Sequence, residues 1–230
     1  MSLYWIVNLL AISVPFLVSF HPRIQLHKKW SLLFSAIIIS LIPFVLWDIW
    51  FTQSGFWGFN ENYLSGHYLL DLPVEEWFFF IAIPYACIFT HYALTTLWHS
   101  VKISNQSVNI ITVVLLVLML VLAVMYHERM YTLVDMVFGI IVLVFAYVID
   151  ASLLRKFYLT FLVMLLPFFV VNGVLTGSGI EGEVVWYNNA QNIGFRIGTI
   201  PIEDIIYAFS LIILNLVLFQ LLDRYKRKSN

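Results

Sequence analysis

Two short stretches of the chain each place a pair of acidic residues just behind a proline and just ahead of a long apolar run. LPVEEWFFF contains Glu75 and Glu76, and IPIEDIIY contains Glu203 and Asp204. A carboxyl group held in apolar surroundings tends to stay neutral, and a neutral carboxylic acid can donate a proton. Both motifs are therefore candidates for general acid–base catalysis.

A structural role is the alternative for these acids, because the dipole of a helix stabilises acidic side chains in its first turn. The recurrence of the pair favours a functional site, since carboxylates within membrane segments are costly. Neighbouring residues on a helix point about 100° apart, so the two members of a pair cannot both face one pocket squarely. We expect Glu75 and Glu203 to face inward, with Glu76 and Asp204 as their partners.

Aromatic residues are frequent around both motifs. An aromatic belt at the membrane interface explains many of them, but aromatic faces also stabilise cations, by about 2 kcal/mol when desolvated. A neutral acid beside aromatic faces suits proton addition to an alkene, with the carbocation shielded from water. The further candidates for substrate binding or for support of the acids are Trp47, Asp48, Asn60, Tyr63, Trp77, Asp135, Asn172, Asn188 and Arg196.

The remaining sequence signals are weaker. Arg196 lies five residues before Pro201, where it can pair with a carboxylate or equally with lipid phosphate. The histidines do not form the spacing of a metal site, so no metal is expected. No glycine-rich dinucleotide motif follows a strand-like segment, and no cofactor is expected either.

The composition determines the elements that must position these residues. Of the 230 residues, 62% are hydrophobic and 11% are charged, against about 25% charged in ordinary soluble domains. A membrane span needs roughly 20 apolar residues, which leaves room for about seven spans and little else. The expected fold class is an all-α polytopic membrane protein with seven transmembrane helices, at residues 3–20, 30–47, 73–97, 108–125, 131–149, 157–175 and 201–222.

The basic residues indicate how these helices are oriented. If the first helix starts outside, ten of the 12 lysines and arginines fall in cytoplasmic segments, and only Arg129 and Arg196 lie outside. Lys and Arg concentrate on the cytoplasmic side of membrane proteins. The N-terminus is therefore expected outside and the C-terminus in the cytoplasm, with the long loops 48–72 and 176–200 together on the outer side.

The chain also contains an internal repeat. PFVLWDIWFTQSG in the first half matches PFFVVNGVLTGSG in the second, which places Asp48 opposite Asn172, and the frame N-x5-G-x6-P-[VI]-E-[ED] follows in both. We expect a first three-helix repeat at 1–100, a linker helix within 101–127 and a second repeat at 128–230, all in one membrane domain. A single linker helix makes the repeats parallel, so both acid motifs lie at one depth and can face one another.

These residues resemble the membrane lycopene cyclase family. The resemblance rests on both acid motifs, on the WD at Trp47 and Asp48, on the FNENYLSG that follows and on RIGTIPIED before the last helix, and it covers nearly the whole chain. In that family two homologous halves occur as separate subunits or fused, and this chain is similar to the fused single-chain bacterial form. The resemblance implies a lycopene beta-cyclase, an isomerase that converts the linear ψ-ends of lycopene to β-ionone rings without redox change.

The resemblance also implies roles for residues and surroundings for the protein. The family's P-x-E-[ED] acids carry over to Glu75 and Glu76 and to Glu203 and Asp204 as catalytic residues. One acid protonates the terminal alkene, the neighbouring double bond captures the tertiary cation, and a carboxylate removes a ring proton. The implied substrate is lycopene from the bilayer of a bacterial inner membrane, with membrane lipid around the protein and no nucleic-acid partner.

The topology by itself leaves one alternative open. Three helices, a linker helix and three more in parallel is also the plan of small-solute transporters of the SWEET type. The proline motifs of those transporters are not followed by acid pairs, and a solute path would need polar residues at the bilayer midplane, where this chain is mostly Leu, Ile, Val and Phe. Expression in cells that accumulate lycopene distinguishes the two, since only a cyclase changes the pigment spectrum.

Overall fold

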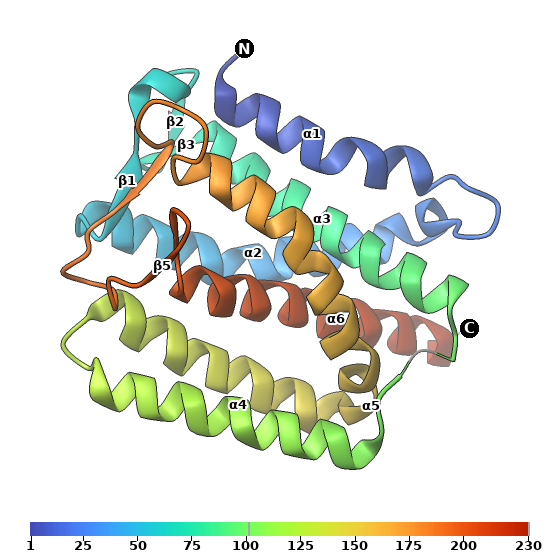
Figure 1. Ribbon diagram of the computed structural model, residues 1–230. Helices are drawn as coiled ribbons and strands as arrows, with labels where there is room; N and C mark the ends of the chain where they lie inside the picture. The colour runs from blue at the N-terminus through green and yellow to red at the C-terminus, as the bar shows by residue number, and fades with distance from the viewer. Residues whose placement is uncertain (101, 230) are drawn as a thin grey trace.

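The chain is mostly helical in the computed structural model, which describes residues 1–100 and 102–229 (Figure 1). The helices in this part of the chain are α1 (Leu3–Val18), α2 (Trp30–Gln53), α3 (Val74–Leu97), α4 (Asn105–Met125), α5 (Met130–Leu175) and α6 (Glu203–Ser229). All but α1 are long and apolar enough to cross a membrane, and α1 is a shorter apolar helix. The expected all-α class is confirmed, while Val101 and Asn230, which the expected linker and second repeat include, lie outside the described residues.

Short strands and 3-10 turns connect the helices. They are η1 (Leu26–Lys29), β1 (Trp57–Phe59), η2 (Glu61–Tyr63), β2 (Tyr68–Leu69), β3 (Leu72–Pro73), β4 (Val185–Tyr187), β5 (Arg196–Ile197) and β6 (Ile200–Pro201). β2 and β3 form an antiparallel hairpin directly before α3, and β5 and β6 form one before α6. β1 pairs antiparallel with β4, so the two long loops lie together as the sequence predicts.

One helix of the structure occupies the place of two expected helices. The backbone of α5 leaves helical geometry at Asp150, where φ is −159° and ψ is 80°. The carboxylate of Asp150 accepts hydrogen bonds from the backbone N–H and the hydroxyl of Ser152, at 3.0 and 2.5 Å, and so caps the second half of the helix. Asp150 also pairs with Arg224 on α6, and the chain bends at this residue without forming a loop. Figure 1 shows the first half of α5 beside α4 and the second half crossing towards α1 and α3.

Other helix ends also differ from the sequence expectation. α2 continues past residue 47 to Gln53, because Asp48 is buried and receives a hydrogen bond from Trp57 instead of ending the helix in solvent. Pro73 and Pro201 end the strands β3 and β6 and do not open the helices that follow. The acids nevertheless occupy the first turns of α3 and α6, as expected.

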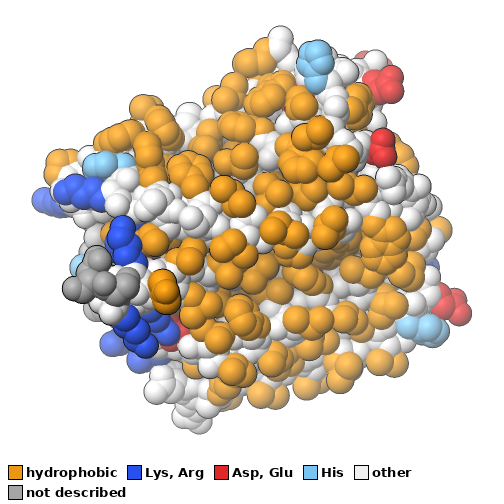
Figure 2. Space-filling model, turned by 180° about the vertical axis from the view of Figure 1, so that it is seen from behind, with side chains coloured by type: hydrophobic (Ala, Val, Ile, Leu, Met, Phe, Trp, Pro, Cys, Tyr) orange, Lys and Arg blue, Asp and Glu red, His pale blue; other side chains and the backbone are white. Residues whose placement is uncertain are grey.

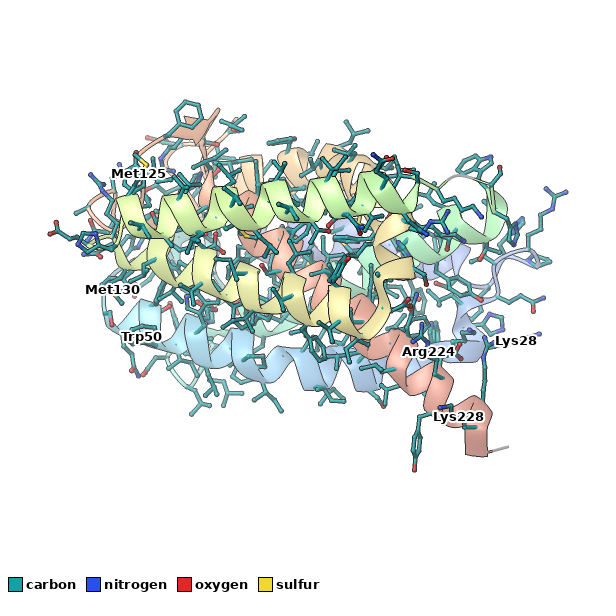
Figure 3. All side chains as sticks on the ribbon, turned by 90° about the horizontal axis from the view of Figure 1, so that it is seen from below. Lys28, Trp50, Met125, Met130, Arg224 and Lys228 are labelled. Atoms are coloured by element: carbon teal, nitrogen blue, oxygen red, sulfur yellow. The ribbon has the colours of Figure 1, made fainter. Side chains whose placement is uncertain are left out.

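Large hydrophobic side chains cover the outside of the helices as well as the core. Figure 2 shows one such face, with the basic side chains gathered at one edge and acidic side chains at the other. Figure 3 shows the basic residues Lys28, Arg224 and Lys228 at one end of the helices, and Trp50 and Met130 at the opposite end. The surface is therefore apolar between two polar ends, as a membrane protein requires.

Candidate active site

The acid motifs meet where the first turns of α3 and α6 flank one small cavity. Glu76 on α3 and Asp204 on α6 both line this cavity of about 60 Å³, which we call the acid chamber. The two side chains are almost fully buried, at 7% and 3% exposure. The polar and aromatic side chains that complete the walls include Tyr4, Asp48, Trp57, Tyr131, Asn172, Tyr187 and Tyr207.

Asp204 accepts three hydrogen bonds at the chamber. The hydroxyl of Tyr131 donates to Oδ1 at 2.6 Å, while the hydroxyl of Tyr187 and the amide of Asn172 donate to Oδ2 at 3.0 and 3.2 Å. These donors come from the start of α5, from β4 and from the end of α5. Hydrogen bonds to the charged form favour that form, so the three donors offset part of the cost of holding a carboxylate in this buried place.

Glu76 and Asp48 have fewer donors. Tyr4 of α1 donates a short hydrogen bond to Oε2 of Glu76. Asp48 Oδ1 accepts from the indole N–H of Trp57 at 2.6 Å and from the hydroxyl of Thr52 at 3.4 Å, while Oδ2 is buried without a partner. Because like charges in one dry site disfavour each other, these two carboxyl groups do not readily ionise together.

Glu75 and Glu203 face the interior of the protein as expected, but they do not line the acid chamber. Both are fully buried, and each places Oε1 between a hydroxyl group near the start of a helix and a backbone N–H of a long loop. The donors are Ser2 Oγ and Ser65 N for Glu75, at 2.8 and 2.7 Å, and Thr132 Oγ1 and Ile193 N for Glu203, at 2.7 and 2.6 Å. The rotation of α3 and α6 about their axes directs the second acid of each pair into the chamber and the first towards the loops.

An apolar groove of about 540 Å³ adjoins the acid chamber. Its walls come from α1, α3, the second half of α5 and α6. The side chains that line both cavities are Phe79, Asn172, Asp204 and Tyr207. Leu10 and Val170 belong to the groove and are 68% and 66% exposed, so the groove opens on the apolar outer surface between α1 and α5. A hydrocarbon can enter such a groove from lipid without crossing water.

Aromatic rings form much of the chamber wall. The rings of Tyr131 and Tyr187 stack at 5.8 Å between centroids, and Trp57 lies 5.2 Å from Tyr131 and 6.1 Å from Tyr207. Burial, followed by the carboxyl groups of Asp204 and Glu76, raises the pKa of Tyr187 well above its ordinary value. Tyr187 therefore remains a hydrogen-bond donor at neutral pH. The described part of the chain holds no cluster of three or more His, Cys, Asp or Glu side chains that could bind a metal ion.

Comparison with known proteins identifies the family. The sequence model of the lycopene cyclase family matches residues 1–94 and 128–222, which together make up most of the chain. The chain belongs to the lycopene cyclase family. A bifunctional lycopene cyclase/phytoene synthase of Aspergillus oryzae (strain ATCC 42149 / RIB 40) is 33% identical over 66 residues, which are 29% of this chain and 11% of that relative. The chain thus aligns with a small part of the fungal protein, and no solved structure matches it.

In this lycopene cyclase family member, four of the candidate residues hold the loops and do not line the chamber. All four bond mainly to backbone groups. Asn60 accepts from the N–H of Asn62, Tyr63 donates to the carbonyl of Glu181, Trp77 donates to that of Leu69, and Asn188 accepts from the N–H of Ala190. Their contribution is to fix the loops that carry Trp57 and Tyr187 over the acids.

Three further candidates lie close to the chamber residues without lining the chamber. Trp47 is buried and packs on Tyr207, with 4.9 Å between the ring centroids. The guanidinium of Arg196 lies 5.7 Å from the ring centroid of Tyr187 and donates to the carbonyl of Thr199, so it supports the β5–β6 hairpin instead of pairing with a carboxylate. Asp135 on α5 is fully buried, and neither of its carboxyl oxygens has a hydrogen-bond partner.

The sequence analysis of this lycopene cyclase family member missed the tyrosines that bond to the acids. Tyr4 begins YWIVN and Tyr131 begins YTLVD, and the two stretches share the pattern Y-x-[IL]-V-[ND] near the start of each half. This second repeat was a signal that could have found them. Tyr207 gives no comparable signal, because its ring reaches the chamber only through the packing of α6.

Proposed function

We propose that this protein is a lycopene beta-cyclase, which converts the linear ψ-ends of lycopene to β-ionone rings by an intramolecular, redox-neutral isomerisation. The observation that carries the proposal is the junction of the acid chamber, with Glu76 and Asp204 in its wall, and the apolar groove of about 540 Å³. A carotenoid has no polar group to bind, so its recognition depends on such a groove. Membership of the lycopene cyclase family supports the same substrate class.

The reaction needs one proton added and one removed. A neutral carboxyl group protonates the terminal double bond of the ψ-end, the next double bond captures the tertiary cation, and a carboxylate takes a proton from the new ring. We assign these steps to Glu76 and Asp204, with Glu75 and Glu203 as the residues that hold the first turns in place. The faces of Trp57 and other chamber rings stabilise the cation, and the aromatic and apolar walls keep water from adding to it.

We also propose that the two halves are parallel three-helix repeats joined by α4, which gives seven spanning segments when α5 is divided at Asp150. In the frame that aligns Glu75 with Glu203, Gly58 aligns with Trp186, and these two residues oppose each other in the β1–β4 pair. Antiparallel pairing of equivalent strands is what a two-fold axis between the halves produces. The basic end seen in Figure 3 supports a cytoplasmic C-terminus and an outer N-terminus in a bacterial inner membrane.

The proposal is tested by expressing the chain in cells that accumulate lycopene and analysing their pigments. The wild type is expected to form β-ring carotenoids. Ala208→Phe is expected to lower this conversion at least about tenfold, because Ala208 lines the groove one turn after Asp204 and a phenyl ring there fills the substrate path. Val148→Phe adds the same ring at a position that is 74% exposed and serves as the control. If the wild type is well expressed and lycopene stays unchanged, the proposed cyclase function is refuted. If Ala208→Phe converts lycopene fully, the groove is not the substrate path.

A further inference from the structure

We propose that the two chamber acids have fixed and different roles: Glu76 donates the proton that starts cyclisation, and Asp204 accepts the proton that leaves the ring. This inference rests on the proposed function and adds the direction in which the proton moves. Two independent observations support it. One is the set of hydrogen-bond donors around each acid, and the other is the position of each acid relative to the groove.

The hydrogen-bond donors are distributed unequally between the two acids. Asp204 accepts from Tyr131, Tyr187 and Asn172, whereas Glu76 accepts from Tyr4. A carboxyl group with three donors is better stabilised as a carboxylate than a group with one. A base must begin as a carboxylate and an acid must begin protonated, so the donor pattern favours Asp204 as the base and Glu76 as the acid.

The residues at one further pair of matched positions, Asp48 and Asn172, strengthen this difference between the two acids. Asp48 and Asn172 occupy equivalent places in the repeat, and both line the acid chamber. Asn172 presents an N–H to Asp204, at 3.2 Å. Glu76 instead shares the chamber with the carboxyl group of Asp48, whose Oδ2 has no partner. The amide donor of Asn172 favours charge on Asp204, and Asp48 provides no such donor to Glu76.

Each acid lies beside the place where the substrate carbon on which it acts is expected. Asp204 lines both the groove and the acid chamber, whereas Glu76 lines the chamber and not the groove. A carotenoid with its polyene in the groove presents the tip of its ψ-end to the chamber. The carbon that carries the polyene becomes the deprotonated ring carbon, and it lies next to the groove. The double bond that receives the proton lies at the tip of the ψ-end, in the chamber that Glu76 lines.

The bonds balance with these two residues alone. The CH carbon of the terminal double bond takes the proton of Glu76, which leaves Glu76 as a carboxylate and a tertiary cation at the dimethyl carbon. The electrons of the next double bond join the dimethyl carbon to the polyene-bearing carbon, and the charge moves to the methyl-bearing carbon beside it. Asp204 removes the proton of the polyene-bearing carbon, and that electron pair becomes the ring double bond. Before the next turnover Asp204 releases this proton to water and Glu76 takes up a proton from water, so each new ring carries one hydrogen that comes from the solvent.

The test compares the wild type, Glu76→Gln and Asp204→Asn in membranes supplied with lycopene in D₂O. Glu76→Gln has no proton donor, and we expect β-ring formation to fall at least about a hundredfold with lycopene recovered unlabelled. Asp204→Asn keeps the donor and lacks the base, and we expect a similar fall in β-rings. Deuterium is nevertheless expected to enter the ψ-end of Asp204→Asn products, as rings that lost a different proton, rings that captured water, or lycopene labelled by reversal.

The outcomes separate this assignment from the proposed function. The wild type must form β-rings with one deuterium per ring, and a failure there refutes the function itself. Labelled or diverted products from Glu76→Gln, or unlabelled lycopene from both variants, overturn the assignment. Tyr187→Phe guards against a folding defect, because it removes one donor from Asp204 and keeps both acids. We expect Tyr187→Phe to shift products away from β-rings with deuterium uptake retained, and an unchanged product ratio counts against Asp204 as the base.

Discussion

One difference between the two sides of the acid chamber is the residue that stands beside each acid. Asp48 and Asn172 hold equivalent places in the internal repeat, and both lie in the wall of the acid chamber. An amide can donate a hydrogen bond to a carboxylate, while a second carboxyl group repels its charge. The two acids therefore stand in different electrostatic surroundings although the motifs that carry them are nearly the same.

Asn172→Asp is expected to make the surroundings of Asp204 resemble those of Glu76. The substitution replaces the amide donor with a carboxyl group 3.2 Å from Asp204, so we expect the rate of β-ring formation to fall about tenfold or more while the fold is kept. Asn189→Asp makes the same chemical change on an exposed loop residue and is the control. Initial rates in membranes with matched protein amounts check this, and equal rates for the two variants would contradict it.

Two hairpins and the helix starts that follow them determine where the acids of the chamber lie. β2–β3 leads into α3 and β5–β6 leads into α6. Glu75 joins the first turn of α3 to α1 and to the loop at Ser65, and Glu203 makes the equivalent connection in the second half. The first acid of each motif thus stabilises the geometry in which the second acid faces the acid chamber.

Glu75→Gln is expected to retain most of the cyclase activity, because the amide oxygen of Gln can accept the same two hydrogen bonds from Ser2 and Ser65. Glu75→Ala removes the acceptor from a fully buried position and leaves the two donors, Ser2 and Ser65, without it, so we expect a loss of stability of about 1–3 kcal/mol and a corresponding loss of active protein. Thermal unfolding in detergent and pigment analysis measure the two effects. A Gln variant that folds normally and yet forms no β-rings would restore Glu75 as a catalytic acid.

The chamber exists only where the two halves of the molecule meet. Glu76, Tyr4 and Asp48 come from the first half, and Asp204 and Tyr131 from the second. The halves are not interchangeable, because the groove opens beside α1 and the second half of α5. On the side of α2 and the first half of α5, aromatic rings fill the space, with 5.2 Å between the ring centroids of Phe44 and Phe138 and 5.5 Å between those of Trp47 and Phe138.

Gly58→Ala is expected to loosen the junction between the halves. A Cβ atom at Gly58 would lie 2.4 Å from the indole of Trp186, so the β1–β4 pair must shift, at a cost of about 1–3 kcal/mol. Gly173→Ala is the matched control, since its Cβ would meet atoms of Ser178 no closer than 3.5 Å. Adding Trp186→Ala should restore the stability of Gly58→Ala. Thermal unfolding checks the series, and a Gly58→Ala protein as stable as the wild type would count against this packing.

Much of this protein was determined by the sequence alone. An 11% charged fraction and long apolar runs leave helices as the way to satisfy backbone hydrogen bonds in a membrane, and the structure is all-α as predicted. The repeated P-x-E-[ED] motif places acids in the first turns of α3 and α6, because proline and acidic residues both favour helix starts. The order of the apolar runs and the distribution of basic residues also predict that the two long loops lie together on one side, and the β1–β4 pair confirms that they lie together.

The tertiary structure alone decided which acid of each pair meets the chamber. Glu75 and Glu76 are adjacent and point about 100° apart, so the orientation of α3 about its axis decides which of them faces the chamber, and that orientation depends on packing against α1 and α2. The bend of α5 at Asp150, whose carboxylate pairs with Arg224 far away in the chain, is likewise a feature of the tertiary structure. Sequence periodicity describes one helix at a time, whereas the chamber and its groove arise from side chains that several helices bring to one place.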